Sequence, residues 1–424
     1  MSSLAYGALW LFIFSVPWES IIRVENTAIV TRVTGTLAAA LALLAVVAAG
    51  RFRRWHVFHV AALLFVVWAG CVHMLHASGE RLPFKYWTFV QLVIVLWIVW
   101  EAAPSGQRQL GLLAAYVLGA YVAAIATIKV YRQGAGDADI QRFSAGQVDP
   151  NDLAMTLALA LPMAWYLATT YRHPLMQWAA RLYLPVGILT LGLTGSRGGM
   201  LAGLVGLLIV PLTMTRLTPA KMVMAIVMLA ASGALAIAYV PDRVVQRLAT
   251  TGLEVQDMNM GGRFKLWEAG IYALGERPVA GFGTGGYKKA ITGQLGPAAQ
   301  VAHNSFVSVL VEQGIVGFVL YMTMFGAVYL ALRDLPTLER RFTLVLLAAL
   351  CTAMMPLTWE DRKPVWVILA MLLGLAQAYV AERGGAATGQ PHSRRAPVAG
   401  YERAARPLGP LAARRRNVDR DATA

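Results

Sequence analysis

Arg197 has the side chain and the position for binding phosphate. It stands in the Gly-Ser-Arg-Gly-Gly sequence at 195–199, between two apolar runs, so we expect it at the N-terminus of a helix. Helix N-termini present unpaired N–H groups and a positive dipole, and a guanidinium adds a fork that matches phosphate oxygens. The alternative is an arginine that only extends its charge to lipid headgroups.

His303 could accept a proton, because imidazole titrates near neutral pH. It lies beside Asn304, where a long polar segment ends and an apolar run begins. A lone histidine at a helix start is more often structural, but the cations nearby favour a transfer reaction with a phosphate leaving group and His303 as base. Neighbouring arginines should lower the pKa of His303. Glu312, at about 900° of helical rotation from His303, should face away from it.

The polar segment at 241–302 joins these groups. With about 60 residues it is too long for an ordinary connection, and such loops commonly carry function. Its cations outnumber its anions, which predicts anion binding. The cations are Arg243, Arg247, Arg263, Lys265, Arg277, Lys288 and Lys289, and the anions are Asp242, Glu254, Asp257, Glu268 and Glu276.

Two motifs lie within this segment. Residues 262–275 have Arg263 near their start and place apolar side chains three or four positions apart. This spacing predicts an amphipathic helix at the membrane surface. Those side chains are Phe264, Trp267, Ile271 and Leu274. The Gly-rich turn at 281–286 matches a dinucleotide-binding pattern, which we reject because no strand precedes it. We expect instead a turn that lets backbone approach a ligand.

Two acidic motifs have plainer interpretations. Asp137 and Asp139 match the Asp-x-Asp motif of metal-dependent sugar-nucleotide transferases, but they lie in a Gly-rich outer loop where sugar nucleotides are not expected. No metal is therefore predicted. Asp149 and Pro150 precede an apolar run, which predicts an N-cap with proline at the first helical position. Substrate contact is the alternative for this second motif.

The composition indicates which elements must hold these residues. Of the 424 residues, 58% are hydrophobic and 14% are charged, which excludes a cytosolic globular enzyme. About twelve apolar runs could each cross a bilayer. They lie at 4–16, 28–49, 55–75, 84–103, 109–130, 152–171, 175–194, 198–215, 219–240, 304–332, 342–358 and 364–382. We predict an all-α polytopic membrane protein with about 12 transmembrane helices.

The cations between the runs predict the orientation. An even number of spans places both termini on one side, and the loops on that side are rich in arginine and lysine. The positive-inside rule then makes both termini cytoplasmic. The segment 241–302 becomes an outer, periplasmic loop between spans 9 and 10.

The C-terminal tail differs in composition from the rest. The chain has a net charge of +15, and residues 383–424 hold nine arginines against three acidic residues. Such a tail cannot bury a core, so we predict a transmembrane domain at 1–382 and a disordered basic cytoplasmic tail at 383–424. Its cations fit a topogenic role better than nucleic-acid binding. Cys71 and Cys351 lie in apolar runs, which excludes a disulfide framework.

The order of these features resembles the O-antigen ligase and polymerase superfamily. An arginine in a Gly-rich turn, a large outer loop headed by a second arginine, and His-Asn followed by Glu-Gln-Gly occur over residues 1–382. The resemblance implies a glycosyltransferase of lipopolysaccharide biosynthesis in the bacterial inner membrane, with its active site facing the periplasm. The donor would be a glycan on undecaprenyl diphosphate, and the acceptor a lipid A-core sugar.

The same resemblance implies roles for individual residues. Arg197 and Arg263 would bind the diphosphate, and His303 would act as the base or position the acceptor. Weaker substrate-binding candidates are Arg277, Lys288, Lys289 and Asn304. Because the carrier diphosphate is already a good leaving group, arginines could neutralise it without a metal or other cofactor, in one inverting displacement.

Two alternatives remain open from the sequence. An O-antigen polymerase would share these features, although the single large loop before the tenth span favours a ligase. A transporter or flippase of an anionic lipid-linked substrate would also have many spans and outer arginines. Transporters usually bind substrate near the membrane midplane and contain internal repeats, whereas these cations lie at the outer edge and no repeat is visible.

Overall fold

A computed structural model describes residues 1–24, 27–76, 82–134, 142–146, 148–214, 218–249 and 262–387. This part of the chain is helical apart from a two-residue antiparallel pairing of β1 (Arg23–Val24) with β2 (Thr27–Ala28). The prediction of an all-α membrane protein is confirmed. The helices are α1 Ser2–Ser15, η1 Val16–Trp18, α2 Ile29–Ala49, α3 Val57–His76, α4 Phe84–Ala102, α5 Gly106–Arg132, α6 Pro150–Thr170, α7 Pro174–Thr194, α8 Arg197–Leu207, α9 Ile209–Met214, α10 Pro219–Tyr239, α11 Asp242–Ala249, α13 Arg263–Leu274, α14 Tyr287–Leu295, η3 Gly296–Ala298, α15 Ser305–Leu332, α16 Thr337–Met354 and α17 Lys363–Ala387.

Nine helical segments in the described residues are long and apolar enough to cross a membrane. They are α2, α3, α4, α5, α6, the consecutive pair α8 and α9, α10, α15 and α17. The apolar helix at Ser2–Trp18 is shorter, and α7 and α16 occupy two further predicted runs. Every predicted run is therefore helical, while the count of twelve spans stays a prediction.

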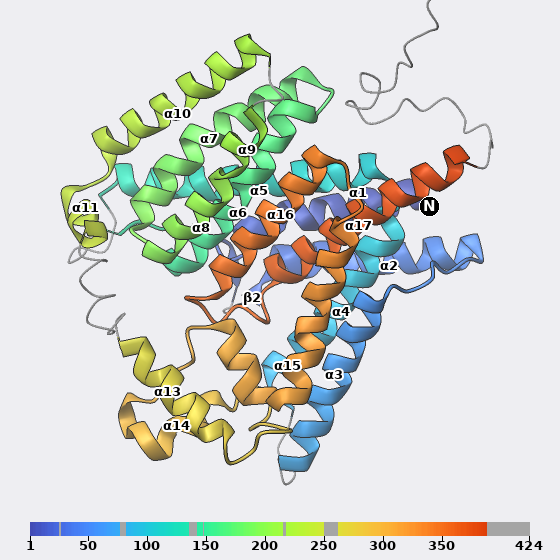
Figure 1. Cartoon of the computed structure of the whole chain (residues 1–424), viewed down its shortest axis with the longest axis vertical. Coiled ribbons are helices and arrows are strands. Elements are labelled where there is room, and N and C mark those ends of the chain that lie inside the picture. The colour runs from blue at the N-terminus through green and yellow to red at the C-terminus, as the bar shows by residue number, and fades with distance from the viewer. Residues whose placement is uncertain are drawn as a thin grey trace, which may run out of the picture.

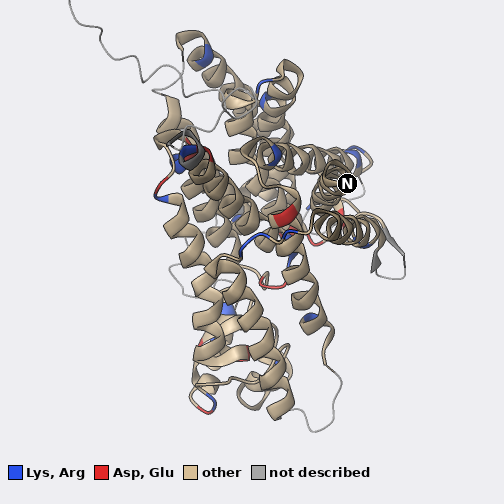
Figure 2. Ribbon diagram, turned by 90° about the vertical axis from the view of Figure 1, so that its right-hand side faces the viewer, with Lys and Arg blue, Asp and Glu red and all other residues tan. Residues whose placement is uncertain are grey.

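The core of the bundle surrounds α6, whose apolar window is 94% buried. This helix packs against α5, α7, α8 and α16. In Figure 1, α13 and α14 lie away from that group, at the lower end of the view beside α15. The long helices are mostly uncharged along their ribbons, as Figure 2 shows. Helix α17 continues to Ala387, past the domain boundary expected at 382, and the rest of the tail lies outside the described residues.

Helix α15 is broken at Gly314, whose φ of 65° and ψ of −173° are not helical. Backbone of the 278–283 segment fills the break. The N–H of Ile315 donates to the Pro278 carbonyl at 2.8 Å, and the N–H of Gly283 donates to the Glu312 carbonyl at 2.7 Å. A Cβ on Gly314 would lie 2.2 Å from the Val279 carbonyl oxygen. The Gly-rich turn therefore approaches the backbone of α15, and its approach to a ligand stays a prediction.

Helix α13 forms where the sequence predicts it, but it buries a different face. Its buried residues are Leu266, Ala269, Gly270 and Ala273. Two of them, Leu266 and Ala269, belong to a small core with Tyr287 of α14, whereas Ile271 is 50% exposed. The exposed Ile271 leaves the membrane-facing side of α13 a prediction, and α14 supplies a partner surface that the spacing within α13 does not reveal.

Candidate active site

Arg197 and Asp149 both stand at helix starts. Asp149 is the N-cap of α6, and its carboxylate accepts the N–H of Asn151 at 2.7 Å, with Pro150 in the first turn. Arg197 is the first residue of α8, and the hydroxyl of Ser196 accepts the N–H of Gly199 at 3.2 Å. Both sequence predictions of helix starts are confirmed.

The two glycines after Arg197 allow close packing at this point. A Cβ on Gly199 would lie 2.4 Å from the Cβ of Ala154 in α6. A Cβ on Gly198 would lie 2.6 Å from Pro356, in the segment between α16 and α17. The start of α8 therefore packs against both the start of α6 and the 355–362 segment. This packing places Arg197 among residues that are far from it in sequence.

Arg263 begins α13 and lies within electrostatic reach of Arg197 and Asp149. Burial lowers the pKa of the half-buried Arg263 guanidinium, the charge of Arg197 lowers it further, and Asp149 partly opposes both. A guanidinium whose charged form is disfavoured by a neighbouring cation indicates a place where an anion would be stabilised. The structure thus brings together the two arginines that the sequence proposed for a diphosphate.

The backbone around His303 is held in a strained conformation. Its φ of 46° makes it the one non-glycine residue with positive φ in the described part of the chain. Its N–H donates to the Thr358 hydroxyl at 3.1 Å. Two residues on, the Ser305 hydroxyl donates to the Leu357 carbonyl and accepts the N–H of Trp359, both at 2.8 Å. Strained backbone of this kind persists only where surrounding contacts hold it, often at functional sites.

The surroundings of His303 favour the neutral imidazole. Burial lowers its pKa below the ordinary 6.5, and Arg263 lowers it further, whereas Asp149 and Asp152 raise it. The downward direction agrees with the expectation from the sequence. The larger cause is burial, however, and the charge of Arg263 comes second. Arg197, Arg263, His303 and Asp149 together form what we call the outer cluster.

Asn304 supports this cluster by capping the helix that begins beside His303. Its side-chain oxygen accepts the N–H groups of Phe306 and Val307 at 3.0 and 3.2 Å, which caps α15. The residue is 5% exposed. Its amide oxygen is therefore occupied in fixing the helix start that carries His303, and the substrate contact suggested by the sequence stays a prediction.

The other cationic candidates lie apart from the outer cluster. Lys288 and Lys289 are exposed on α14, and the exposed Arg277 places its guanidinium 5.1 Å from the ring of Phe282. Within the described residues, none of the three is among the charges that act on His303 or Arg263. The substrate-binding roles of these three residues stay predictions. Asp137 and Asp139 lie outside the described residues.

Sequence reasoning missed the segment between α16 and α17. There Trp359 donates its indole N–H to Asp152 at 2.8 Å, and Arg362 pairs with the same carboxylate at 3.5 Å. Asp152 is one of the charges that act on His303. The sequence alone could not identify this segment, because contacts between residues so far apart leave no local pattern.

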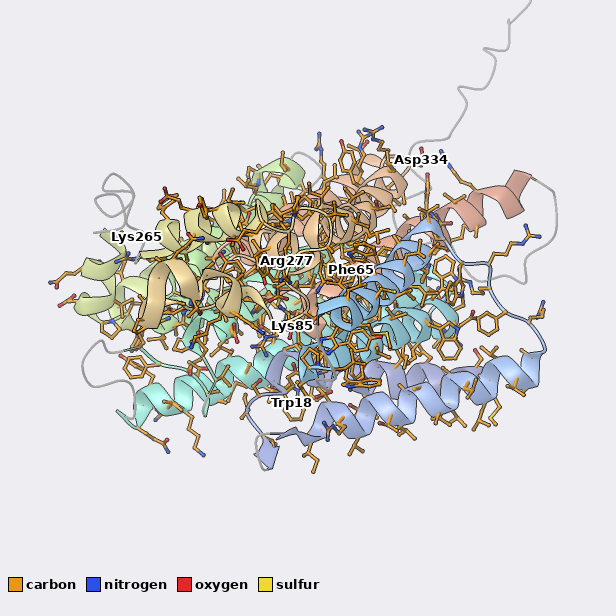
Figure 3. All side chains as sticks on the ribbon, turned by 90° about the horizontal axis from the view of Figure 1, so that it is seen from below. Trp18, Phe65, Lys85, Lys265, Arg277 and Asp334 are labelled. Atoms are coloured by element: carbon orange, nitrogen blue, oxygen red, sulfur yellow. The ribbon has the colours of Figure 1, made fainter. Side chains whose placement is uncertain are left out.

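A buried ion-pair network was also missed. Lys85 of α4 pairs with Glu312 at 2.8 Å and with Glu360 at 2.5 Å. Figure 3 shows Lys85 toward the middle of the molecule, whereas Lys265 lies at its margin. Glu312 also accepts the N–H of Gly285, and it is not among the charges that act on His303. The signal was present in the sequence, because ionisable residues within apolar runs commonly serve a function.

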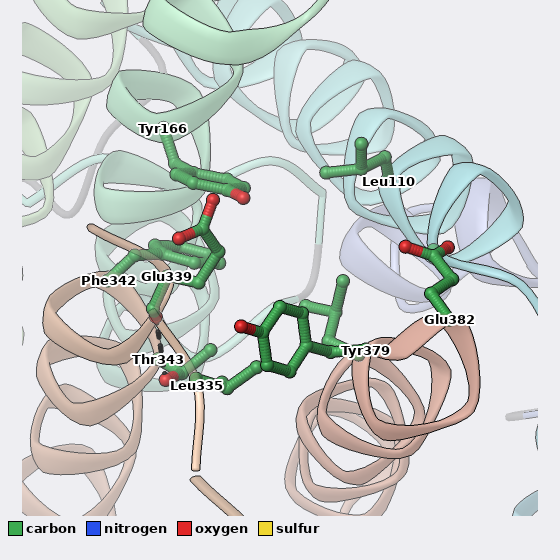
Figure 4. Close-up of a pocket in the computed structure, with 10 residues that line it drawn as sticks. Leu110, Tyr166, Leu335, Glu339, Phe342, Thr343, Tyr379 and Glu382 are labelled. Carbon is green, nitrogen blue, oxygen red and sulfur yellow. Dashed lines mark hydrogen bonds between the residues drawn. The ribbon is translucent and has the colours of Figure 1, made fainter. Parts of the chain in front are cut away.

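A pocket at the opposite ends of the helices does not fit a diphosphate. It lies between α5, α6, α16 and α17, and its walls include two carboxylates, those of Glu339 and Glu382 (Figure 4). These carboxylates would repel an anionic donor. Among the described residues, no three His, Cys, Asp or Glu side chains are grouped so that they could hold a metal ion.

Comparison with known proteins agrees with this site. Residues 182–322, which include Arg197, Arg263 and His303, match the family described as O-antigen ligase. This match supports membership of the O-antigen ligase superfamily. An uncharacterized protein of Haemophilus influenzae (strain ATCC 51907 / DSM 11121 / KW20 / Rd) is 22% identical over 201 residues, covering 43% of this chain. The matched part is 49% of that relative, so the chain spans about half of its length.

Proposed function

We propose that this protein is an O-antigen ligase. It transfers a glycan from an undecaprenyl diphosphate carrier to a sugar of the lipid A core, at the periplasmic face of the bacterial inner membrane. The observation that carries the proposal is the outer cluster, in which Arg263 lies within electrostatic reach both of Arg197 and of His303, whose pKa is lowered. This arrangement suits a reaction that releases a diphosphate and removes a proton.

The proposed reaction is a single displacement at the anomeric carbon of the donor. The acceptor hydroxyl oxygen forms the new bond to that carbon, and the bond from the carbon to the diphosphate oxygen breaks. Its electron pair leaves on undecaprenyl diphosphate, whose charge Arg197 and Arg263 neutralise. The hydroxyl proton passes to His303, which is neutral at physiological pH because its pKa is lowered. Attack opposite the leaving group inverts the anomeric configuration, and no step calls for a metal.

A polymerase remains the second candidate, since the family match includes that type of reaction. It would use a second carrier-linked glycan as acceptor in place of the lipid A core. A transporter of the lipid-linked glycan is a weaker alternative, because the cations gather at one end of the helices and not midway along them. The three candidates differ in the covalent product.

Reconstitution tests the proposal. Purified protein in liposomes would receive an undecaprenyl diphosphate-linked glycan with or without lipid A-core. A ligase forms glycan attached to lipid A-core and requires that acceptor. Longer carrier-linked chains made from donor alone would identify a polymerase, and movement of intact donor across the bilayer without a new bond would identify a transporter.

A further inference from the structure

A second pocket adjoins the outer cluster and has no role in the chemistry described so far. It lies between the end of α1 with η1, the start of α6, and the segment that leads into α17. Its lining includes Trp18, Glu19, Asp152, Trp359 and Arg362. Aromatic surface combined with a few polar groups is typical of small-molecule sites.

The lining combines flat aromatic rings with charged groups that form hydrogen bonds. Indole rings offer an apolar face together with a polar N–H, which suits the alternating CH faces and hydroxyls of a sugar. Carboxylates accept hydrogen bonds from hydroxyls, and a guanidinium donates to them. Each of these charged groups has a partner within the protein, because Arg362 pairs with Asp152 and Glu19 pairs with Lys363 at 2.7 Å. The pocket is therefore close to electrically balanced, which favours a hydroxyl-rich ligand over a strongly charged one.

One polar group in the lining lacks a partner. The indole nitrogen of Trp18 is buried and has no hydrogen-bond acceptor among the described residues. Buried donors are normally satisfied, and an unsatisfied one costs roughly 1–3 kcal/mol. A ligand hydroxyl in the pocket would supply the missing acceptor.

The position of the pocket indicates which substrate it holds. Asp152 and Trp359 form its wall, and the backbone N–H of Trp359 donates to the hydroxyl of Ser305, two residues from His303. The N–H of His303 donates to Thr358, the neighbour of Trp359. The pocket therefore adjoins the backbone that carries the proposed base, which the attacking hydroxyl must reach.

We infer that this pocket binds the acceptor sugar, with Trp18 and Trp359 against the ring and Glu19, Asp152 and Arg362 toward its hydroxyls. The inference rests on the proposed function, since it assigns one substrate of that reaction to a place in the structure. It identifies Trp18 as a residue that determines acceptor affinity without entering the displacement.

Kinetics of Trp18→Ala test this assignment. At saturating donor, we expect the KM for lipid A-core to rise at least about tenfold, a change of about 1.4 kcal/mol. The KM for donor should stay within about twofold, because loss of one subsite affects one substrate. Trp178→Ala is the matched control, since Trp178 is 47% exposed on α7 and lies outside the pocket lining. An unchanged acceptor KM in Trp18→Ala would refute the inference, as would a rise confined to donor KM.

A binding measurement separates this inference from the proposed function. Saturation-transfer NMR can detect core oligosaccharide released from lipid A on the purified protein, without donor or turnover. We expect contact with wild type and with Trp178→Ala, and its loss in Trp18→Ala. If Trp18→Ala does not fold, Trp18→Phe keeps a ring, removes the N–H and should weaken contact. Loss of binding in a protein that transfers nothing would uphold the subsite and refute the ligase. If both Trp18 variants of an active ligase bound the oligosaccharide normally, the subsite would be refuted and the ligase upheld.

Discussion

The backbone N–H of His303 donates a hydrogen bond to the hydroxyl of Thr358 at 3.1 Å, although the residues are 55 positions apart. Ser305 adds two further bonds to the same segment, to Leu357 and Trp359. The imidazole is therefore carried by a helix start that is attached to the connection between α16 and α17. Such support favours the fixed geometry that proton transfer requires.

His303→Gln distinguishes a base from a positioning residue. Glutamine can form hydrogen bonds but cannot take the proton of the acceptor hydroxyl. We expect turnover to fall by roughly 10²- to 10⁴-fold, the usual contribution of a general base, with donor binding retained. The measurement is kcat for glycan transfer together with binding of labelled donor. Near wild-type kcat in the glutamine variant would eliminate the base assignment.

Asp149→Asn should shift the pH dependence in a defined direction. A base must be neutral to act, so activity declines as pH falls through the pKa of His303, which lies below the ordinary 6.5. Asp149 raises that pKa, and removing its charge should move the decline to still lower pH. Asparagine retains the N-cap of α6. Profiles of kcat for wild type and variant between about pH 5 and 8 decide the matter, and a shift to higher pH would contradict the account.

Arg197→Lys should weaken use of the donor even though the charge is kept. Lysine replaces the planar fork with a point charge and loses bidentate contact with phosphate oxygens. We expect kcat/KM for donor to fall at least about tenfold, which is about 1.4 kcal/mol of transition-state binding. Arg51→Lys, at an exposed position between α2 and α3, serves as the control and should have little effect. Full activity in Arg197→Lys would count against its contact with the diphosphate.

Lys85→Met should destabilise the folded protein. Two carboxylates, those of Glu312 and Glu360, would then lie buried without their shared cation. Breaking a buried ion pair in this way costs roughly 3–5 kcal/mol of unfolding free energy. Thermal unfolding in detergent should show a clearly lower midpoint than wild type, whereas the exposed Lys265→Met should match wild type. Adding Glu360→Gln to Lys85→Met should recover part of the loss. An unaltered midpoint in Lys85→Met would show that the network contributes little.

Much of the helical framework could be predicted from apolar runs, because each run is a local property of the chain. The break at Gly314 could not, since it depends on the 278–283 backbone that inserts into α15. The buried face of α13 depends in the same way on α14. Local periodicity describes an element, whereas its partner surface is decided by tertiary packing.

The same distinction between local pattern and tertiary contact applies to the residues of the candidate site. Arg197, Arg263 and His303 could be recognised because charged or titratable groups at helix starts are uncommon in an apolar chain. Trp359 and Arg362 could not, since their role depends on contact with Asp152, about half the sequence away. Lys85 and Glu360 are 275 positions apart, so their pairing also could not be predicted, although each is an ionisable residue within or beside an apolar run.

The central claim is that the outer cluster exchanges a carrier diphosphate for an acceptor hydroxyl. Mass spectrometry of a reconstituted reaction in the presence of EDTA tests it most directly, by counting undecaprenyl diphosphate released against glycan attached to lipid A-core. The account predicts equal amounts, inverted anomeric linkage in the product, and neither product when the acceptor is omitted. Carrier release without acceptor, or loss of both products that Mg²⁺ or Mn²⁺ restores, would contradict it.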